Sequence, residues 1–445
     1  GISGYVGTMS DIDISDDAAA LISAGDSILN KAGVDIVTAS DTSVNASIGG
    51  DLAGFTADIE FDVVDTADLI AAEVTASGFG AGGLDEANNL IVSGGNVDVA
   101  DAADIQAISM YNGSASDYDI TDTAAALISA GDSILNKAGV DTVSVTGGPV
   151  GASDGAMLAS FTADIDFDVS DTAANIAAQV ASGVAQGYGS DSLDEADSVF
   201  VESGAAVTAA QAESVQDLIN YSGGDIDITD NAANLISAGD HVLNVTGVDV
   251  VTVNDGATSA QDGAILAGFT ADVEFDVVDT ANLVAAEVAG SGYGSGSLDE
   301  ANDLVVSGGD VDTAAAAAIQ QISEYNETGS GYEITDNAAA VISAGDSVIE
   351  DGGVTRVEVT GDASAAQGVD LNAYSANVDF DVRDTAENIA DNSGSLGKAD
   401  EVSVISGGNA VDVAEAQAIQ GLAGYQTGAS EYEIEDNAAA IISAT

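Results

Sequence analysis

The stretch "ADIDFDVSDTAANI", residues 163–176, decides the fold that we expect for this chain. Apolar Ile165, Phe167 and Val169 alternate there with acidic residues, which is the pattern of a strand with one buried face. Apolar residues return at helical spacing after Asp171. A carboxylate at that point can accept N–H groups of a helix's first turn, which stabilises the helix by about 1 kcal/mol. We therefore predict a strand that leads directly into a helix, with Asp171 as the helix N-cap.

The same aspartate recurs along the whole chain. It opens a D-[TND]-A triplet in one series whose members lie 106, 108, 106 and 100 residues apart: Asp16, Asp122, Asp230, Asp336 and Asp436. A second series follows the first by 48 or 49 residues: Asp65, Asp171, Asp279 and Asp384. A fixed period of this kind indicates internal repeats. Each repeat is about 105 residues long and divides into two related halves of about 50.

The repetition predicts an α/β tandem repeat in which each half-repeat runs strand–helix–strand–helix. In the second repeat we expect a strand at residues 119–121 and a helix from Thr123 towards Gly139, with Gly131 inside it. The predicted repeats are residues 1–116, 117–224, 225–331, a shorter fourth at 332–430 and a partial fifth at 431–445.

The alternation within the strands predicts how the layers are arranged. A parallel sheet that is covered on both faces shows continuous apolar runs, whereas the strands here alternate apolar and acidic residues. One sheet face should therefore pack against helices while the other faces water. This favours a solenoid-like or beads-on-a-string arrangement of two-layer α/β units over a doubly wound fold.

Charge is the outlying property of the composition. The 445 residues include 76 Asp and Glu against 5 Lys and Arg, for a formal net charge of −71. Nucleic acid is excluded as an electrostatic partner because phosphate binding needs basic residues. Acids two apart on a strand lie about 6.6 Å from each other. The Debye length is about 8 Å in physiological salt and about 3 Å in brine. Brine therefore screens the repulsion between these acids more strongly. The chain should require salt, divalent cations, or both.

Ladders of alternating acids are the candidate metal ligands. Ca²⁺ prefers six to eight oxygen ligands, and carboxylates on adjacent strands, about 4.8 Å apart, can share an ion. Diffuse counterions over a solvated acidic face are the alternative. The candidate residues are Asp11, Asp13, Asp16, Asp117, Asp119, Asp122, Asp164, Asp166, Asp168, Asp225, Asp227, Asp230, Asp272, Glu274 and Asp276.

Other residue types argue against catalysis. The chain has no cysteine and a single histidine, His241, so a nucleophile–base–orienter triad has one possible base. Carboxylate pairs for glycoside hydrolysis carry no information in a chain with acids throughout. We expect no enzyme activity and no membrane insertion, since no apolar run approaches the roughly 18 residues of a membrane-spanning helix.

Asn-X-Ser/Thr triplets begin at several asparagines, among them Asn45, Asn112, Asn244 and Asn326. This triplet is the acceptor sequence for N-linked sugars, and it also arises by chance in chains rich in Ser and Thr. The sequence by itself leaves both readings open.

Three stretches carry a resemblance to a known class of protein: "DTAANIAAQV" (171–180), "VTAAQAESVQ" (207–216) and "YEITDNAAAVISAG" (332–345). They resemble the tandem repeats of very large secreted bacterial surface proteins and adhesins of cyanobacteria and proteobacteria. The resemblance covers essentially the whole chain. It implies an extracellular or cell-surface protein with a structural or adhesive role that often depends on calcium.

These observations favour an extracellular structural protein that forms a filament, stalk or surface layer. A segment of an adhesin or phage fibre that binds glycans through its loops is the alternative. The chain begins with Gly1 and stops inside a repeat, so we expect it to be processed or part of a longer array. Ile434, Ile441 and Ile442 occupy positions that an interior repeat would bury, and we expect them to mediate head-to-tail contact between copies.

Overall fold

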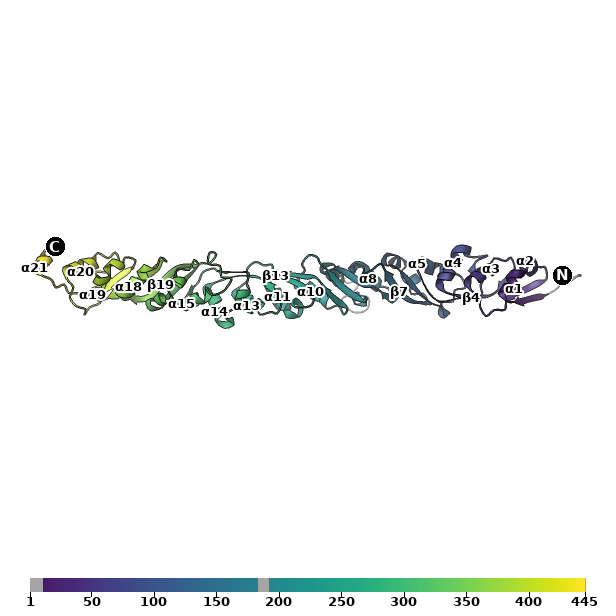
Figure 1. Ribbon diagram of the computed structural model, residues 1–445, viewed down its shortest axis with the longest axis horizontal. Coiled ribbons are helices and arrows are strands. Elements are labelled where there is room, and N and C mark those ends of the chain that lie inside the picture. Colours follow the sequence, from purple (N-terminus) through teal and green to yellow (C-terminus); the bar gives the residue numbers. More distant parts are fainter. Residues whose placement is uncertain (1–10, 183–191, 445) are drawn as a thin grey trace. The chain divides into compact units, whose positions relative to one another are not determined.

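The computed structural model describes residues 11–182 and 192–444. The chain forms two compact units. The first comprises the described residues up to 206 together with 211–226, and the second comprises 207–210 and the residues from 227 onward. Within each unit, short strands and helices alternate along the chain (Figure 1).

Small parallel sheets form one layer of each unit. Strands that are neighbours in a sheet are also consecutive in the chain. The sheets that begin in the first unit contain β1 (Ile12–Asp16), β2 (Val34–Ala39) and β3 (Ile59–Glu60); β4 (Asp62–Asp65), β5 (Asn89–Val97), β6 (Asp117–Thr123), β7 (Val140–Thr146) and β8 (Ile165–Asp166); and β9 (Asp168–Thr172), β10 (Ser198–Glu202) and β11 (Tyr221–Gly224).

The remaining sheets also place consecutive strands side by side. They contain β12 (Ile226–Asp230), β13 (Val248–Val253) and β14 (Val273–Glu274); β15 (Asp276–Asp279) and β16 (Asp303–Val306); and β17 (Asp310–Val311), β18 (Tyr332–Asn337), β19 (Val354–Ala363), β20 (Val378–Asp384) and β21 (Glu401–Val404). Parallel neighbours need a crossover connection, and short helices supply it.

The crossover helices are mostly seven to eleven residues long. Up to residue 216 they are α1 (Ala18–Ala24), α2 (Asp26–Leu29), α3 (Ala46–Ala53), α4 (Ala67–Ser77), α5 (Val99–Ala107), α6 (Ala124–Ala130), α7 (Asp132–Leu135), α8 (Ala152–Ala159), α9 (Ala173–Ala181) and α10 (Ala209–Gln216), with 3₁₀ turns at Leu84–Glu86, Gly113–Ala115 and Leu193–Glu195. Beyond it they are α11 (Ala232–Ala238), α12 (Asp240–Leu243), α13 (Ala260–Ala267), α14 (Ala281–Ser291), α15 (Thr313–Ile319), α16 (Ala338–Ala344), α17 (Asp346–Ile349), α18 (Ala365–Ala373), α19 (Ala386–Asn392), α20 (Val413–Gln420) and α21 (Ala438–Ser443), with 3₁₀ turns at Leu298–Glu300 and Ser393–Ser395. The predicted α/β class is confirmed.

The alternation predicted for residues 163–176 is confirmed, but the single strand is not. Ile165, Phe167 and Val169 are buried, and the acids between them are exposed. The stretch nevertheless forms two strands, because β8 pairs with β7 while β9 pairs with β10. The chain changes sheets at Phe167.

The continuous helix predicted from Thr123 is also wrong. Gly131 has φ 61° and ψ −175°, a backbone conformation available almost only to glycine. It ends α6 and begins the short helix α7. The apolar face continues across the break, since Leu127 and Leu135 are both buried.

A glycine brings one helix of each repeat close to the sheet. A Cβ atom on Gly155 of α8 would lie 2.8 Å from Cγ2 of Val169 and 3.4 Å from the Phe167 ring. The same contact, to a valine, a phenylalanine and a leucine, occurs at Gly49, Gly155, Gly263 and Gly368. The close approach of this helix to the sheet therefore depends on a residue without a side chain at this position.

Candidate cation sites

The aspartate that organises the sequence has a different role from the predicted one. Thr172, not Asp171, is the N-cap of α9, because its hydroxyl accepts the N–H of Asn175. Asp171 instead uses Oδ2 to accept the N–H of Ala152, the first residue of the preceding helix α8, at 3.0 Å. Its Oδ1 accepts the N–H of Thr172 at 2.8 Å and the side-chain amide of Asn175 at 2.7 Å. The aspartate therefore joins each strand to the helix before it.

This contact recurs in both aspartate series. In the second series the donor lies nineteen residues upstream, in the pairs Asp65–Ala46, Asp171–Ala152, Asp279–Ala260 and Asp384–Ala365. The first series shows it in the pairs Asp122–Val99, Asp230–Ala209, Asp336–Thr313 and Asp436–Val413. The sequence reading missed Asp41 and Asp255, which accept the N–H groups of Ala18 and Ala232 in the same way.

Hydrogen bonding lowers the pKa of Asp171 and Asp384. Partial burial raises the pKa of Asp171, but the bonds from Asn175, Ala152 and Thr172 outweigh it and hold the pKa below its usual range. The pKa of Asp384 is lowered by the same balance, with Asn388 and Ala365 among the donors. Asp122 and Asp230 were predicted as metal ligands. Each instead accepts a hydrogen bond from a backbone N–H group.

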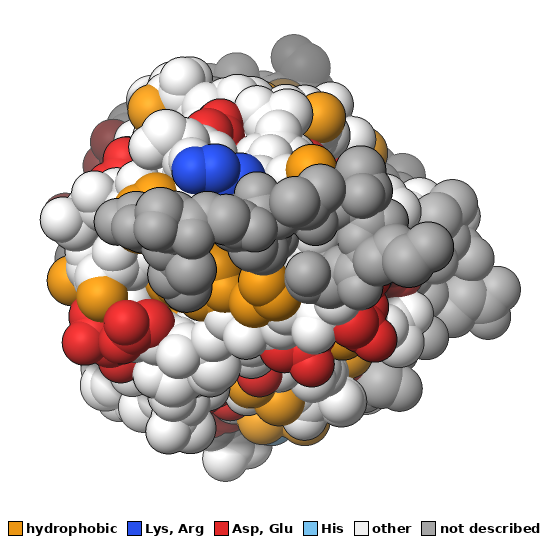
Figure 2. Space-filling view, turned by 90° about the vertical axis from the view of Figure 1, so that its right-hand side faces the viewer, with side chains coloured by type: hydrophobic (Ala, Val, Ile, Leu, Met, Phe, Trp, Pro, Cys, Tyr) orange, Lys and Arg blue, Asp and Glu red, His pale blue; other side chains and the backbone are white. Residues whose placement is uncertain are grey.

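Three exposed carboxylates meet at the start of the first sheet. Asp11 precedes β1, Asp13 lies in β1 and Asp35 lies in the neighbouring strand β2, and each offers an oxygen within 4.8 Å of the others. The hydrogen bond with Asp11 and the charge of Asp11 raise the pKa of Asp35, with smaller contributions from desolvation and from Asp13. Figure 2 views the end of the molecule marked N in Figure 1 and shows acidic side chains in several separate patches.

A second group of the same kind consists of Asp225, Asp227 and Asp249. Its members lie 214 residues after those of the first group. The two groups could each hold a metal ion. Sequence reasoning included four of these six residues but missed Asp35 and Asp249. Both follow a Gly-Val pair at the start of a strand, and this shared position is the signal that could have identified them.

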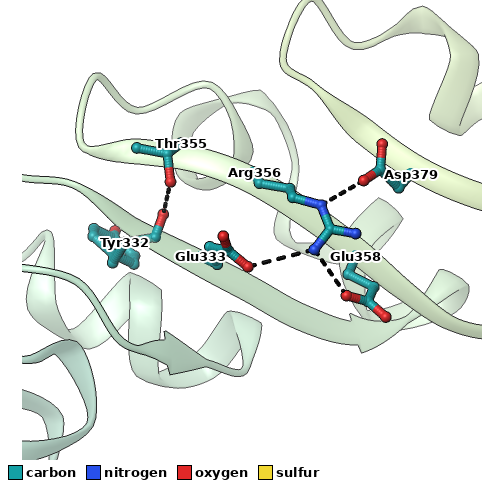
Figure 3. A network of polar contacts seen from close by, with 6 residues as sticks. All are labelled: Tyr332, Glu333, Thr355, Arg356, Glu358 and Asp379. Carbon is teal, nitrogen blue, oxygen red and sulfur yellow. Dashed lines mark hydrogen bonds and ion pairs between the residues drawn. The ribbon is translucent and has the colours of Figure 1, made fainter.

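The equivalent position in the fourth repeat carries its own cation (Figure 3). Nε of Arg356 lies 2.5 Å from Asp379, and a terminal guanidinium nitrogen lies 3.0 Å from Glu358 and 3.5 Å from Glu333. Glu333 is 106 residues after Asp227 and belongs to the same repeat position. Asp379 and the two glutamates thus surround one positive charge on the water-facing side of the sheet.

The fourth repeat differs from the first and third at several of these positions, since Gly331 also stands in place of Asp11 and Asp225. Arg356 stands where the first and third repeats have Ile36 and Val250, and Thr355 stands in place of Asp35 and Asp249. The repeats with an apolar residue at this position bring three carboxylates together. The repeat with the arginine pairs its acids with a guanidinium instead. A cation therefore fits this position in the strand.

The other predicted ligands do not form such groups. Among residues 11–182 and 192–444, only the two groups above place three acidic oxygens within 4.8 Å of one another. Asp119 accepts the N–H and hydroxyl of Thr142, Asp168 accepts the hydroxyl of Ser198, and Glu274 accepts that of Thr252. Asp16 accepts the N–H of its neighbour. The remaining members, Asp117, Asp164, Asp166, Asp272 and Asp276, belong to no such group.

The residues predicted for assembly are exposed. Ile434 and Ile441 are 46% and 45% exposed, whereas their equivalents Ile334 and Val341 are fully buried. Ile442 is 73% exposed. An apolar surface therefore lies on the segment 431–444.

Two shallow hollows remain. One is lined by residues 53–58, Ala81, Gly82 and Glu86, and the other by Ala386, residues 405–409 and 431–433. Neither lining contains histidine or a basic residue. Within the described part of the chain, no helix has the length and apolar character needed to cross a bilayer.

A comparison with models of known protein families and with curated proteins finds no match to this chain. The resemblance to secreted surface proteins therefore stays a prediction.

Proposed function

We propose that this chain is an extracellular, cation-stabilised structural protein whose tandem α/β repeats build a filament, stalk or surface layer. The observation that carries the proposal is the recurring bond from an aspartate to the helix nineteen residues upstream, at Asp65, Asp171, Asp279 and Asp384. Each strand–helix segment thereby completes the helix cap of the segment before it. A segment that depends on its successor is the unit of a solenoid-like array.

Sheet topology supports the same reading. Consecutive strands are parallel neighbours, so the chain adds one strand and one helix at a time in one direction. Stability in such an array accumulates from contacts between adjacent segments. The architecture presents repeated surfaces instead of one enclosed cavity, and the proposal includes no catalytic activity.

Cations are the second part of the proposal. The groups Asp11–Asp13–Asp35 and Asp225–Asp227–Asp249 offer three carboxylates each, which are hard oxygen ligands of the kind that Ca²⁺ takes, with water able to complete the coordination. Arg356 supports this assignment because a positive charge occupies the equivalent position in the fourth repeat. The net charge of −71 makes cation binding favourable over the whole surface.

Copies of the chain are the proposed partners. Ile434 and Ile441 expose nearly half of their side chains where interior repeats bury the corresponding residues. Full burial of an isoleucine contributes about 1.5–3 kcal/mol, so covering both adds roughly 2 kcal/mol to an end-to-end contact. A contact between unlike surfaces does not close on itself and extends into filaments.

Electron microscopy of the purified chain in saline with millimolar Ca²⁺ tests the assembly. We expect filaments from the native chain, and shorter particles from Ile441→Asp. Leu283→Asp is the matched control, because Leu283 is 49% exposed on α14, outside the proposed contact. A native chain that stays monomeric at high concentration contradicts the filament.

Calorimetric titration with Ca²⁺ at fixed ionic strength tests the cation sites separately. We expect Asp35→Asn and Asp249→Asn each to remove one binding event, while Asp141→Asn, at the equivalent position of the second repeat, removes none. Equal binding by all three variants would leave only diffuse screening.

A further inference from the structure

The five Asn-X-Ser/Thr triplets, at Asn45, Asn112, Asn220, Asn244 and Asn326, differ in whether the asparagine nitrogen is available. Asn220 is half-buried, and its Nδ2 donates to the backbone oxygen of Asp194 at 3.2 Å. Two are engaged with a neighbouring strand, because Nδ2 of Asn112 donates to Asn89 and Nδ2 of Asn326 donates to Asp303, each at 3.0 Å. Both asparagines are half-buried. A sugar on either nitrogen would break the bond and push the two strands apart.

The triplet at Asn45 is held by a helix. Asn45 is the N-cap of α3, and its Oδ1 accepts the N–H of Ile48 at 2.9 Å. The serine of this triplet, Ser47, lies within α3. A transferase would have to unwind the first turn and remove a cap worth about 1 kcal/mol.

Asn244 is free of these constraints. It is exposed and ends α12, in a turn that leads to β13, and Thr246 of the same triplet is exposed too. No other described residue forms a hydrogen bond with the side chain of Asn244. Asn30 and Asn136 end the equivalent short helices α2 and α7 with nearly the same backbone angles, but alanine stands two residues later. The third repeat alone combines this turn with the hydroxyl residue.

We propose that Asn244 is the attachment site of an N-linked sugar. A transferase would join Nδ2 of Asn244 to C1 of a sugar activated as a nucleotide or lipid pyrophosphate. The C1–O bond to phosphate breaks, the leaving phosphate takes the electron pair, and the amide nitrogen loses one proton to solvent. A bulky polar group at this exposed turn leaves the sheet contacts intact. The proposal that Asn244 is modified in the natural protein rests on the proposed extracellular role. The accessibility of Asn244 does not depend on that role.

Peptide mapping by mass spectrometry tests the site on the folded chain. The purified chain is incubated with UDP-glucose and a soluble N-glucosyltransferase that recognises Asn-X-Ser/Thr, and synthetic peptides spanning the five triplets serve as unfolded controls. We expect a hexose on Asn244 alone in the folded chain, and on all five peptides. Asn244→Gln and Thr246→Val should abolish it. Ala138→Thr should add a second hexose at Asn136, because it completes the triplet on the equivalent turn.

Modification of Asn112 or Asn326 at the same rate in the folded chain would refute the structural selection. The decisive measurement is the mass of the Asn244 peptide from chain isolated from its natural source. A sugar there supports the proposal, and a bare peptide overturns it. A glycosylated chain that remains monomeric would refute the filament and leave the glycan site standing.

Discussion

Replacing Asp171 by alanine tests the contact between successive segments most directly. The change removes the acceptor of three hydrogen bonds, from Ala152, Thr172 and the side chain of Asn175. Asp166→Ala is the matched control, since it removes an equal charge from an exposed position five residues away. Asp166 accepts no hydrogen bond from the described residues, and its charge helps to raise the pKa of Asp197.

The expected loss of stability follows from the hydrogen-bond donors that the substitution leaves unpaired. Ala152 is fully buried, so water cannot easily replace the lost acceptor for its N–H. An unsatisfied buried donor costs about 1–3 kcal/mol, and loss of a helix cap costs about 0.5–2 kcal/mol. We expect Asp171→Ala to lower the free energy of unfolding by about 2 kcal/mol. Asp166→Ala should be neutral or slightly stabilising, because it relieves repulsion.

Urea denaturation in 1 M NaCl, which screens general repulsion, measures both variants. The pKa of Asp171 is lower in the folded chain than in the unfolded one, so its contribution is present above the unfolded pKa of about 3.9 and is lost as the pH falls through the folded value. The difference in the free energy of unfolding between the two variants should therefore be largest at pH 7 and vanish in strong acid. Equal stability of the two variants at pH 7 would refute the reasoning.

Three further predictions concern charge and backbone. The pKa of Asp35 is raised by its neighbours, so ionised Asp35 destabilises the fold once the pH exceeds its unfolded pKa. Asp35→Asn should raise the melting temperature at pH 7 in low salt with a chelator present. It should also reduce the rise in melting temperature that Ca²⁺ produces. A lower melting temperature of the variant in chelator would contradict the repulsion. Arg356→Gln should lower the melting temperature slightly, because the guanidinium is partly exposed, and the difference should shrink in 1 M salt. Gly131→Ala should lower the free energy of unfolding by about 1–3 kcal/mol in urea denaturation, because of the backbone conformation of Gly131. Gly54→Ala is the control and should be neutral, because Gly54 has φ −71°. Equal effects of the two substitutions would argue against backbone strain at Gly131.

Local patterns were enough to predict the α/β class of this protein and the buried positions of its strands. Alternation in residues 163–176 correctly identified Ile165, Phe167 and Val169 as buried, because side chains on a strand point to opposite faces in turn. The spacing of the aspartates located equivalent positions, and those positions make equivalent contacts at Asp65 and Asp171.

Tertiary structure decided which groups meet across segments. The sequence placed Asp171 next to its own helix, yet its carboxylate also reaches the helix nineteen residues earlier. The division of one strand at Phe167 depends on which neighbours are available for pairing, and no local pattern carries that information. Asp35 joins Asp11 and Asp13 because parallel pairing of β1 and β2 brings a distant residue alongside. Hydrogen bonds and charge repulsion act over a few ångströms in space, so their partners are determined only after the register between segments is set.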